Sequence, residues 1–300
     1  MRLSGLVDLL SEDPGVASAI EDARGRVPAF DLTAPPAVRP VLIAALAKGT
    51  GRPILLVTST FREAEAVTSA LGVVLGEDDV CYYPAWETLP HERLSPRADT
   101  VGRRLGVLRR IAGVDELPPP AVVVAPVRSL LQPQVKDLAQ LRPVRLQAGA
   151  DYDMTQLAQD LVAAAYQRVD LVQRRGEFAV RGGIVDVFPP TEPHPVRVEF
   201  FGDQIDEIRP FTVADQRSSD TQLTEVVAAP CRELLITSEV QTRAAQLLPD
   251  HPELAEMLEK IAQGQAVEGM EALIPALVDQ LELLIDVLPS DTLVLVADPE

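Results

Sequence analysis

The chain has 300 residues, of which 47% are hydrophobic and 24% are charged, so its apolar share is ample for a packed core and excludes wholesale disorder. Its net charge of -18 at pH 7 argues against a nucleic-acid-binding surface over much of the chain, because duplex binding depends on Lys and Arg side chains that neutralise phosphates. A length of 300 residues favours about two domains.

No segment of the sequence predicts a membrane anchor or an exported protein. The longest apolar runs, such as 54–57 and 121–125, are far shorter than the roughly 20 residues that a bilayer span needs. Acidic residues interrupt the first 31 positions, which excludes a secretory signal. Cys81 and Cys231 have no CxxC partner, so we interpret them as reduced thiols of a cytoplasmic protein.

The first 141 residues alternate helical patterns with short apolar runs of strand length. Helices are predicted at Leu3–Leu10, Val16–Val27, Val41–Ala47, Phe61–Gly72 and Arg97–Ile111, and strands at Val27–Leu32, Ile54–Val57, Val80–Tyr83 and Ala121–Ala125. Continuous apolar runs are typical of strands that are buried on both faces. Their alternation with helices predicts a doubly wound, parallel-sheet α/β domain.

Residues 142–220 have a different character. A helix is predicted at Met154–Tyr166, and strand-like runs follow at Phe178–Phe188, Val196–Phe201 and Gln204–Phe211. The tight Gly202-Asp203 turn between the last two runs indicates a hairpin. The segment therefore predicts a small antiparallel α+β domain.

Residues 221–300 return to helices and are strongly acidic. Helices are predicted at Ser238–Leu248, Pro252–Gln263 and Met270–Leu284, and a buried type of strand at Thr292–Ala297. Three basic and 15 acidic side chains give this segment a net charge of -12, which favours a solvated face or a basic protein neighbour. We predict that segments 1–141 and 221–300 form one α/β domain, into which 142–220 is inserted. Because the chain ends directly after a core-like strand, we also expect it to be part of a longer one.

A phosphate-binding loop is predicted to be degenerate. No GxxxxGK[ST] pattern occurs, and the stretch between the predicted strand Val27–Leu32 and the next helix contains Thr33, Pro35, Pro36, Ala37 and Val38. Its prolines have no N–H to offer a phosphate, and it has neither a lysine nor a terminal hydroxyl for magnesium. We therefore expect no nucleotide at Thr33, Ala37 and Val38.

The sequence contains no recognisable catalytic or metal-binding constellation. His91, His194 and His251 lie in separate turn-like contexts without HxxxH spacing, which favours ordinary surface histidines. No GxSxG elbow occurs either. The prediction is a chain that is not an enzyme and holds no cofactor or metal.

The predicted strand 196–201 carries the clearest binding signal. Side chains alternate between the two faces of a strand, so the outward face carries Arg197, Glu199 and Phe201. An arginine beside an aromatic ring is typical of protein-interaction hot spots. Arg181 precedes Gly182-Gly183 in the neighbouring run, where the missing side chains let a partner approach closely. Packing of Phe201 under the loop 189–195 is an equal alternative.

Two motifs resemble bacterial repair proteins. The stretch Tyr82-Tyr83-Pro84-Ala85-Trp86-Glu87-Thr88-Leu89-Pro90, continued by Ser95-Pro96, is similar to the start of the transcription-repair coupling factors. Residues 175–189, RGEFAVRGGIVDVFP, resemble a signature that this family shares with the excision-repair protein UvrB, and 197–206 continue it. Together the motifs cover roughly residues 25–220.

The resemblance implies a UvrB-like module in which the inserted domain binds UvrA. In that family the UvrA contact uses an arginine of the R-G motif, an arginine that opens the next strand and an aromatic residue at its end. These positions correspond to Arg181, Arg197 and Phe201. The family members are ATP-driven DNA translocases that dislodge stalled RNA polymerase. Contacts with RNA polymerase, duplex DNA, ATP and Mg²⁺ would belong to regions beyond residue 300.

Three departures distinguish this sequence from UvrB. Ala37 and Val38 stand where the lysine and hydroxyl of the UvrB phosphate loop would be. Asp298 is followed by Pro299 in place of the acidic ATPase pair, and Trp86 is the one aromatic left where UvrB has its tyrosine-rich damage probe. We therefore predict a non-catalytic adaptor that recruits UvrA to stalled RNA polymerase in transcription-coupled nucleotide excision repair. The alternative is a UvrB-like, ATP-dependent enzyme with an unorthodox nucleotide site.

Overall fold

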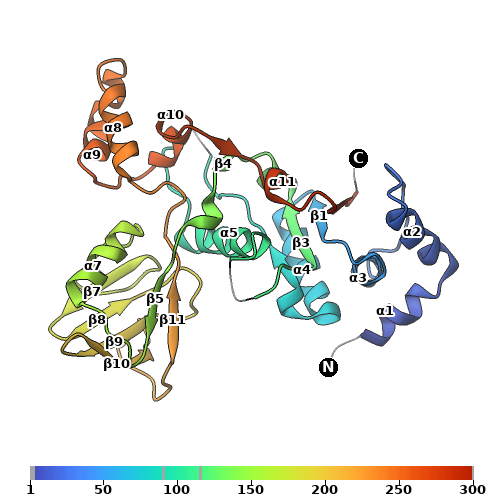
Figure 1. The fold of residues 1–300 in the computed structure, drawn as a ribbon, viewed down its shortest axis with the longest axis horizontal. Coiled ribbons are helices and arrows are strands. Elements are labelled where there is room, and N and C mark those ends of the chain that lie inside the picture. Colours follow the sequence, from blue (N-terminus) through green and yellow to red (C-terminus); the bar gives the residue numbers. More distant parts are fainter. Residues whose placement is uncertain (1–3, 90–91, 115–116, 299–300) are drawn as a thin grey trace. The chain divides into compact units, whose positions relative to one another are not determined.

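The computed structural model describes residues 4–89, 92–114 and 117–298. Contacts divide the chain into two compact units. Unit 1 comprises the described residues of 1–85, 107–133 and 282–300, and unit 2 comprises those of 86–106 and 134–281. The colours of Figure 1 show that the middle of the chain forms unit 2 and that its last residues return to unit 1.

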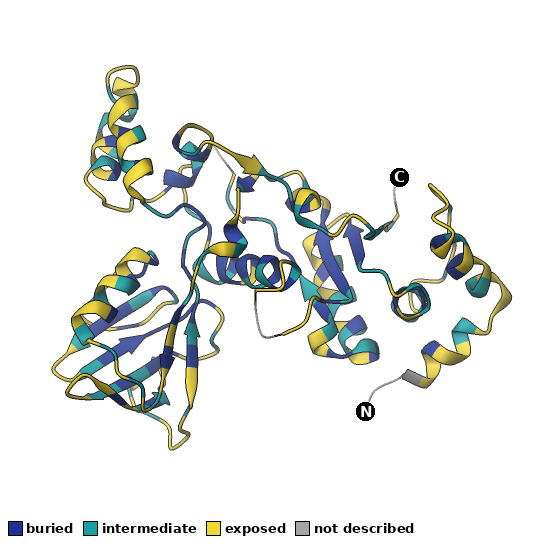
Figure 2. Cartoon of the chain, viewed as in Figure 1, coloured by how far each residue is buried: buried dark blue, intermediate teal, exposed yellow. Residues whose placement is uncertain are grey.

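The core of unit 1 is a four-stranded parallel sheet with the order β13-β1-β3-β2. Its strands are β1 (Ile54–Thr58), β2 (Val80–Tyr82), β3 (Val122–Pro126) and β13 (Leu293–Val296). Every residue of β1 and β3 is buried, as Figure 2 shows in dark blue. The predicted parallel α/β fold is thereby confirmed, and the final strand pairs with β1 as a member of the same sheet.

Unit 1 also contains helices. They are α1 (Ser4–Ser11), α2 (Pro14–Arg24), α3 (Arg39–Thr50), α4 (Phe61–Leu75), α6 (Val127–Leu130) and α11 (Leu284–Val287), with a 3₁₀ turn, η1 (Glu77–Asp79). Helices α1 to α4 lie close to predicted positions, whereas the short α6 and α11 were not predicted. Two helices begin at side-chain caps, since Asp13 accepts from the first amides of α2 and Thr60 accepts from the amide of Glu63 in α4. Helix α5 (Ala98–Ile111) contributes residues to both units.

The strand predicted at Val27–Leu32 is wrong. These residues are irregular in the structure. Pro28 has no amide hydrogen to donate to a ladder, and the two places beside β1 are occupied by β3 and β13. The degenerate loop at 33–38 therefore follows an irregular segment before α3.

Unit 2 contains a five-stranded sheet with the order β10-β9-β8-β7-β6. Its strands are β6 (Gln167–Arg168), β7 (Glu177–Arg181), β8 (Ile184–Val187), β9 (Val196–Phe201) and β10 (Gln204–Pro210). One face packs against α7 (Met154–Ala163) and against the antiparallel pair of β5 (Val144–Gln147) and β11 (Glu225–Ala228) in a single hydrophobic core. This arrangement is the predicted small α+β domain.

Two glycine turns shape the ends of this sheet. The run predicted at 178–188 is two strands, because Gly182 has a φ of +60° and reverses the chain between β7 and β8. Gly202 has a φ of +63° and joins β9 to β10, which confirms the predicted hairpin. Glycine is the residue that adopts such left-handed backbone without strain.

The rest of unit 2 is mainly helical and differs in one part from the prediction. It contains β4 (Gln134–Val135), η2 (Leu138–Gln140), α8 (Ser238–Leu247), η3 (Pro252–Leu254), α9 (Ala255–Ala262), η4 (Met270–Leu273), α10 (Ile274–Leu277) and β12 (Leu281–Glu282), which pairs with β4. The helix predicted at 270–284 is wrong. It is broken into η4, α10 and β12, and Val278 after α10 is already extended. Residues 234–281 thus pack in unit 2, whereas 282–298 pack in unit 1.

Two residues of the motif at 82–96, Trp86 and Ser95, have a structural role inside unit 2. The indole Nε1 of Trp86 donates to Glu233 Oε1 at 3.0 Å, and the fully buried Arg104 forms an ion pair with the same carboxylate. A further residue of the motif, Ser95, donates its hydroxyl to Glu271 Oε2 at 2.6 Å. A buried ion pair is strongly destabilising when one partner is lost, so these residues fix how the segments of unit 2 pack.

Candidate partner-binding surface

The sheet of unit 2 turns its second face away from α7, and this outer face carries the three predicted site residues. On β9, Val196 and Val198 are buried in the core, whereas Arg197 and Glu199 are half-buried on the opposite side and Phe201 is exposed. The alternation predicted for this strand is therefore present. We define the outer face by Arg181, Asp186, Arg197, Glu199 and Phe201.

A buried carboxylate joins the two arginines. Asp186 lies on β8 directly opposite Arg197 of β9, and 1% of its surface is exposed. Arg197 donates from Nε to Oδ1 at 2.8 Å and from Nη2 to Oδ2 at 3.0 Å. Arg181 reaches from β7 and donates its Nη2 to the same Oδ2. The structure thus brings Arg181 and Arg197 together on one acceptor.

Arg197 is embedded in the domain. Its guanidinium carbon lies 5.0 Å from the centre of the Phe211 ring, and Nη1 donates to the Gln216 carbonyl and the Ser218 hydroxyl, both at 3.3 Å. The hydrogen bond with Asp186 raises the pKa of Arg197 above its ordinary value. Only 17% of its side chain is exposed. Arg197 therefore offers little free surface to a partner.

Phe201 and Arg181 are much more accessible. Phe201 exposes 81% of its surface, so the alternative in which it packs under residues 189–195 is wrong. Arg181 exposes 47% of its side chain. Gly182 leaves open space beside Arg181, since a Cβ built there meets no atom within 4 Å. The end of the sheet therefore presents a free ring and a partly free guanidinium next to open backbone.

Asp186 is the functional candidate that sequence reasoning missed. It stands in the run Ile184–Val187, whose other members are apolar, and an acidic residue within an apolar strand is a usable signal. A buried carboxylate requires charged or hydrogen-bonding partners, so such a residue predicts a nearby cation. The identity of that cation depended on strand pairing across the sheet, which the sequence does not display.

The loop at 33–38, which we predict to be a degenerate phosphate loop, precedes an ion pair made by Arg39. Thr33 and Ala37 are exposed, and Val38 precedes α3 without a side-chain cap. Arg39 at the start of α3 donates to both carboxylate oxygens of Asp298, at 2.7 and 2.9 Å. This interaction lowers the pKa of Asp298 and raises that of Arg39. Asp298 follows the carboxyl end of β13, the edge at which such folds bind nucleotides. Pro299 lies outside the described residues.

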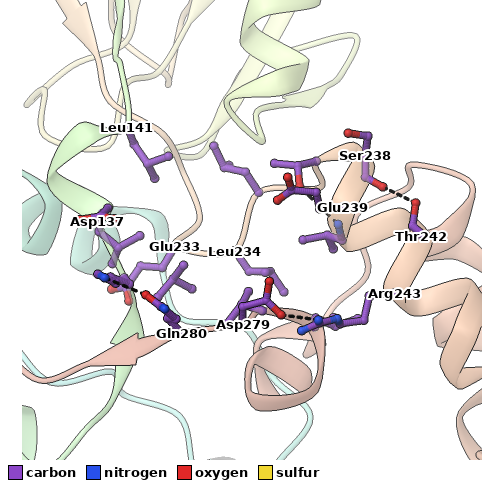
Figure 3. Close-up of a pocket in the computed structure, with 18 of the residues that line it drawn as sticks. Asp137, Leu141, Glu233, Leu234, Ser238, Glu239, Thr242, Arg243, Asp279 and Gln280 are labelled. Carbon is purple, nitrogen blue, oxygen red and sulfur yellow. Dashed lines mark hydrogen bonds and ion pairs between the residues drawn. The ribbon is translucent and has the colours of Figure 1, made fainter.

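A cavity of about 780 Å³ in unit 2 is lined in part by charged side chains that are bonded to other residues of its wall. It lies between η2, α8 and the segment after α10 (Figure 3). Arg243 pairs with Asp279 across it, and Lys136 Nζ donates to Gln280 Oε1 at 2.7 Å. Glu233 in its wall is already bonded to Trp86 and Arg104. The cationic side chains of this cavity are thus engaged within its own wall.

Other candidate groups stay dispersed. Cys81 and Cys231 are both free thiols, and burial raises the pKa of each. His194 and His251 lie in separate loops, and His91 is outside the described residues. Over 4–89, 92–114 and 117–298, no three His, Cys, Asp or Glu side chains gather closely enough to hold a metal ion. No helix within those ranges has the length and apolarity needed to cross a membrane.

A protein-family match identifies the domain that carries the outer face. The UvrB interaction domain family matches residues 144–233, a range that includes β5 to β11 and the whole outer face. The chain thus contains a UvrB interaction domain in unit 2 and a parallel α/β fold in unit 1.

Relatives of the whole chain are the transcription-repair-coupling factors. The chain is 48% identical to those of Mycobacterium bovis and Mycobacterium tuberculosis over 311 aligned residues, which cover 99% of this chain and 25% of each relative. It is 31% identical to that of Bacillus subtilis over 86% of the chain and 23% of the relative. These matches confirm the resemblance to the N-terminal region of this family. The chain spans about a quarter of the length of the curated relatives it matches.

Proposed function

We propose that this chain recruits UvrA in transcription-coupled nucleotide excision repair, and that the outer face binds it through Arg181, Arg197 and Phe201. The observation that carries the proposal is the Phe201 ring, 81% exposed at the end of β9. The arginine Arg181 lies on the same face and is fixed by a buried carboxylate. The match of the UvrB interaction domain to 144–233 supports the assignment, because it includes all three residues.

The three residues contribute differently in this proposal. Phe201 and Arg181 contact UvrA directly, because they are the accessible members. Arg197 supports them from below through Asp186 and Phe211. The partner surface that fits is an apolar recess for the ring beside a carboxylate for the free donors of Arg181, since guanidinium pairs best with carboxylate.

In this proposal the chain is a non-catalytic adaptor without a cofactor of its own. The parent protein is an ATP-driven DNA translocase of the cytoplasm. It binds RNA polymerase, duplex DNA, ATP and Mg²⁺ through regions outside these 300 residues. The name of the relatives, transcription-repair-coupling factor, supports the link to transcription.

Calorimetric titration of UvrA into the chain tests the proposal. Phe201→Ala and Arg181→Ala should each weaken binding by about 2 kcal/mol, or about 30-fold, as truncations of hot-spot residues do. Phe61→Ala and Arg145→Ala are matched controls, because Phe61 is an exposed ring of unit 1 and Arg145 is a half-exposed arginine paired with Glu225. Both controls should bind UvrA like the unmodified chain. Equal affinity for all four variants would overturn the proposal.

A further inference from the structure

Asp186 occupies an unusual place for an acidic residue. It lies on β8, the middle of three antiparallel strands, and faces outward between Ala179 of β7 and Arg197 of β9. Its side chain is nevertheless only 1% exposed, and both Arg181 and Arg197 form ion pairs with it. At this burial a partner protein has no access to the carboxylate itself.

The carboxylate is a fixed point for both arginines. Because β8 is paired on both sides, its backbone holds Asp186 rigidly in the sheet. Burial of a carboxylate is costly unless charged donors compensate it, and here three hydrogen bonds from two guanidiniums do so. Each arginine is in turn restrained to the geometry that this carboxylate imposes.

The restraint has different consequences for the two arginines. Arg197 has further restraints besides Asp186, since it bonds to Gln216 and Ser218 and lies over the Phe211 ring. Among the described residues, the Arg181 side chain hydrogen-bonds to Asp186 alone. Nearly half of this side chain is exposed. Without Asp186 the long Arg181 side chain would sample many rotamers, and this freedom would be lost on binding.

We propose that Asp186 is a positioning residue for the docking of UvrA, which acts by holding the guanidinium of Arg181 in its binding orientation on the face that also carries Phe201. The inference rests on the proposed function, because it assumes that Arg181 contacts UvrA. A positioning role differs from a purely structural one because the effect of Asp186 on UvrA binding should disappear when Arg181 is absent.

A double-mutant cycle measures this dependence. UvrA is titrated into the chain carrying Asp186→Asn, Arg181→Ala, both changes, or neither. Asp186→Asn alone should weaken binding about tenfold, whereas adding it to Arg181→Ala should weaken binding no more than about twofold. Glu225→Gln is the control, since Glu225 pairs with Arg145 in the β5–β11 pair, on the other side of the sheet from the outer face. It should bind UvrA normally, and thermal unfolding should show each variant to be folded.

A second variant protects the test against loss of folding. Asp186→Glu keeps the negative charge that compensates the arginines but moves the carboxylate by one methylene. It should weaken UvrA binding several-fold in the unmodified chain and hardly at all in the Arg181→Ala background.

The outcomes separate the two proposals. If Arg181→Ala weakens binding but the Asp186 variants do not, or if they weaken it equally with and without Arg181, the positioning role is overturned and UvrA recruitment stands. If Arg181→Ala and Phe201→Ala both bind normally, the proposed docking face itself is wrong.

Discussion

Phe201 and Phe211 are two phenylalanines of the same domain in opposite environments. Phe211 is 1% exposed and stacks under Arg197, whereas Phe201 lies almost fully in solvent. Burial of such a side chain is worth about 2 kcal/mol, so an exposed ring forgoes that stabilisation. This contrast at the scale of single residues is the reason to assign Phe201 to binding and Phe211 to folding.

The contrast predicts separable effects on stability. Phe211→Ala should lower the free energy of unfolding by about 3–5 kcal/mol, because it leaves a cavity beneath Arg197. Phe201→Ala should change it by no more than about 0.5 kcal/mol. Urea unfolding of the two variants followed by circular dichroism measures both values. A large loss for Phe201→Ala would mean that the ring has a structural role.

Two buried ionisable residues predict how stability depends on pH. Burial raises the pKa of Cys231 and, strongly, that of Tyr166, whose hydroxyl donates to the Ala229 carbonyl at 2.9 Å. In the unfolded chain these groups ionise near 8.5 and 10. Above those values the unfolded chain releases protons that the folded chain keeps. The stabilisation is therefore complete below about pH 8.5 and decreases as pH rises, by about 1.4 kcal/mol per pH unit and group.

Unfolding in urea between pH 8 and 10.5 tests this expectation. The free energy of unfolding should fall with pH, and Cys231→Ala should reduce the slope by about one proton. An unchanged slope in that variant would show that Cys231 ionises equally in both states.

Elements with local signals were predictable, and elements that depend on distant partners were not. The apolar runs of β1 and β3 are local signals, and each strand lies within one residue of its predicted position. The pair β5–β11 joins residues about 80 positions apart, and neither strand is marked by a turn of its own. The supposed strand at 27–32 had a suitable composition but no open place beside β1.

Close packing of α5 is an element-scale feature that the sequence does not reveal. A Cβ on Gly102 would lie 2.5 Å from Cβ of Pro190 in the loop after β8, whereas a Cβ on Gly106 of the same helix meets nothing within 4 Å. Gly102 is therefore required by the approach of that loop, and Gly106 is not.

This difference predicts opposite effects for the same substitution. Gly102→Ala should destabilise the chain by about 1–3 kcal/mol through overpacking. Gly106→Ala should stabilise it by up to about 1 kcal/mol, because alanine has the higher helix propensity. Thermal unfolding of the two variants side by side measures this. Equal shifts would contradict the packing of Pro190 on Gly102.

For the molecule as a whole, the sequence was sufficient for the fold class and for the outward set of β9, because both follow from periodicity. It could not predict which of the three site residues are exposed to solvent. Their exposure depends on Asp186, Phe211 and the 211–218 segment, which meet only in the folded sheet. The assignment of UvrA as the partner came from the family motif and could not have come from physical pattern alone.

Because the loop at 33–38 has no lysine or terminal hydroxyl for a phosphate, we predict that nucleotides do not stabilise the chain. A ligand at 100 times its dissociation constant would add about 2.7 kcal/mol of stability. We expect millimolar Mg-ATP to leave the melting temperature of the chain unchanged, with Mg-AMP as the matched control. A saturable increase with Mg-ATP alone would instead favour the UvrB-like enzyme.

The Arg39–Asp298 pair has a consequence for how such a module can be regulated. In nucleotide-dependent switches, contacts with the γ-phosphate change the conformation of the protein. Here the Arg39 guanidinium and the Asp298 carboxylate bond to each other at the carboxyl end of β13. If Mg-ATP leaves the chain unchanged as expected, UvrA binding at the outer face should not depend on the ratio of ATP to ADP. In that case we expect the moment of UvrA binding to be set by whether UvrA can reach the outer face, and not by nucleotide hydrolysis in this chain.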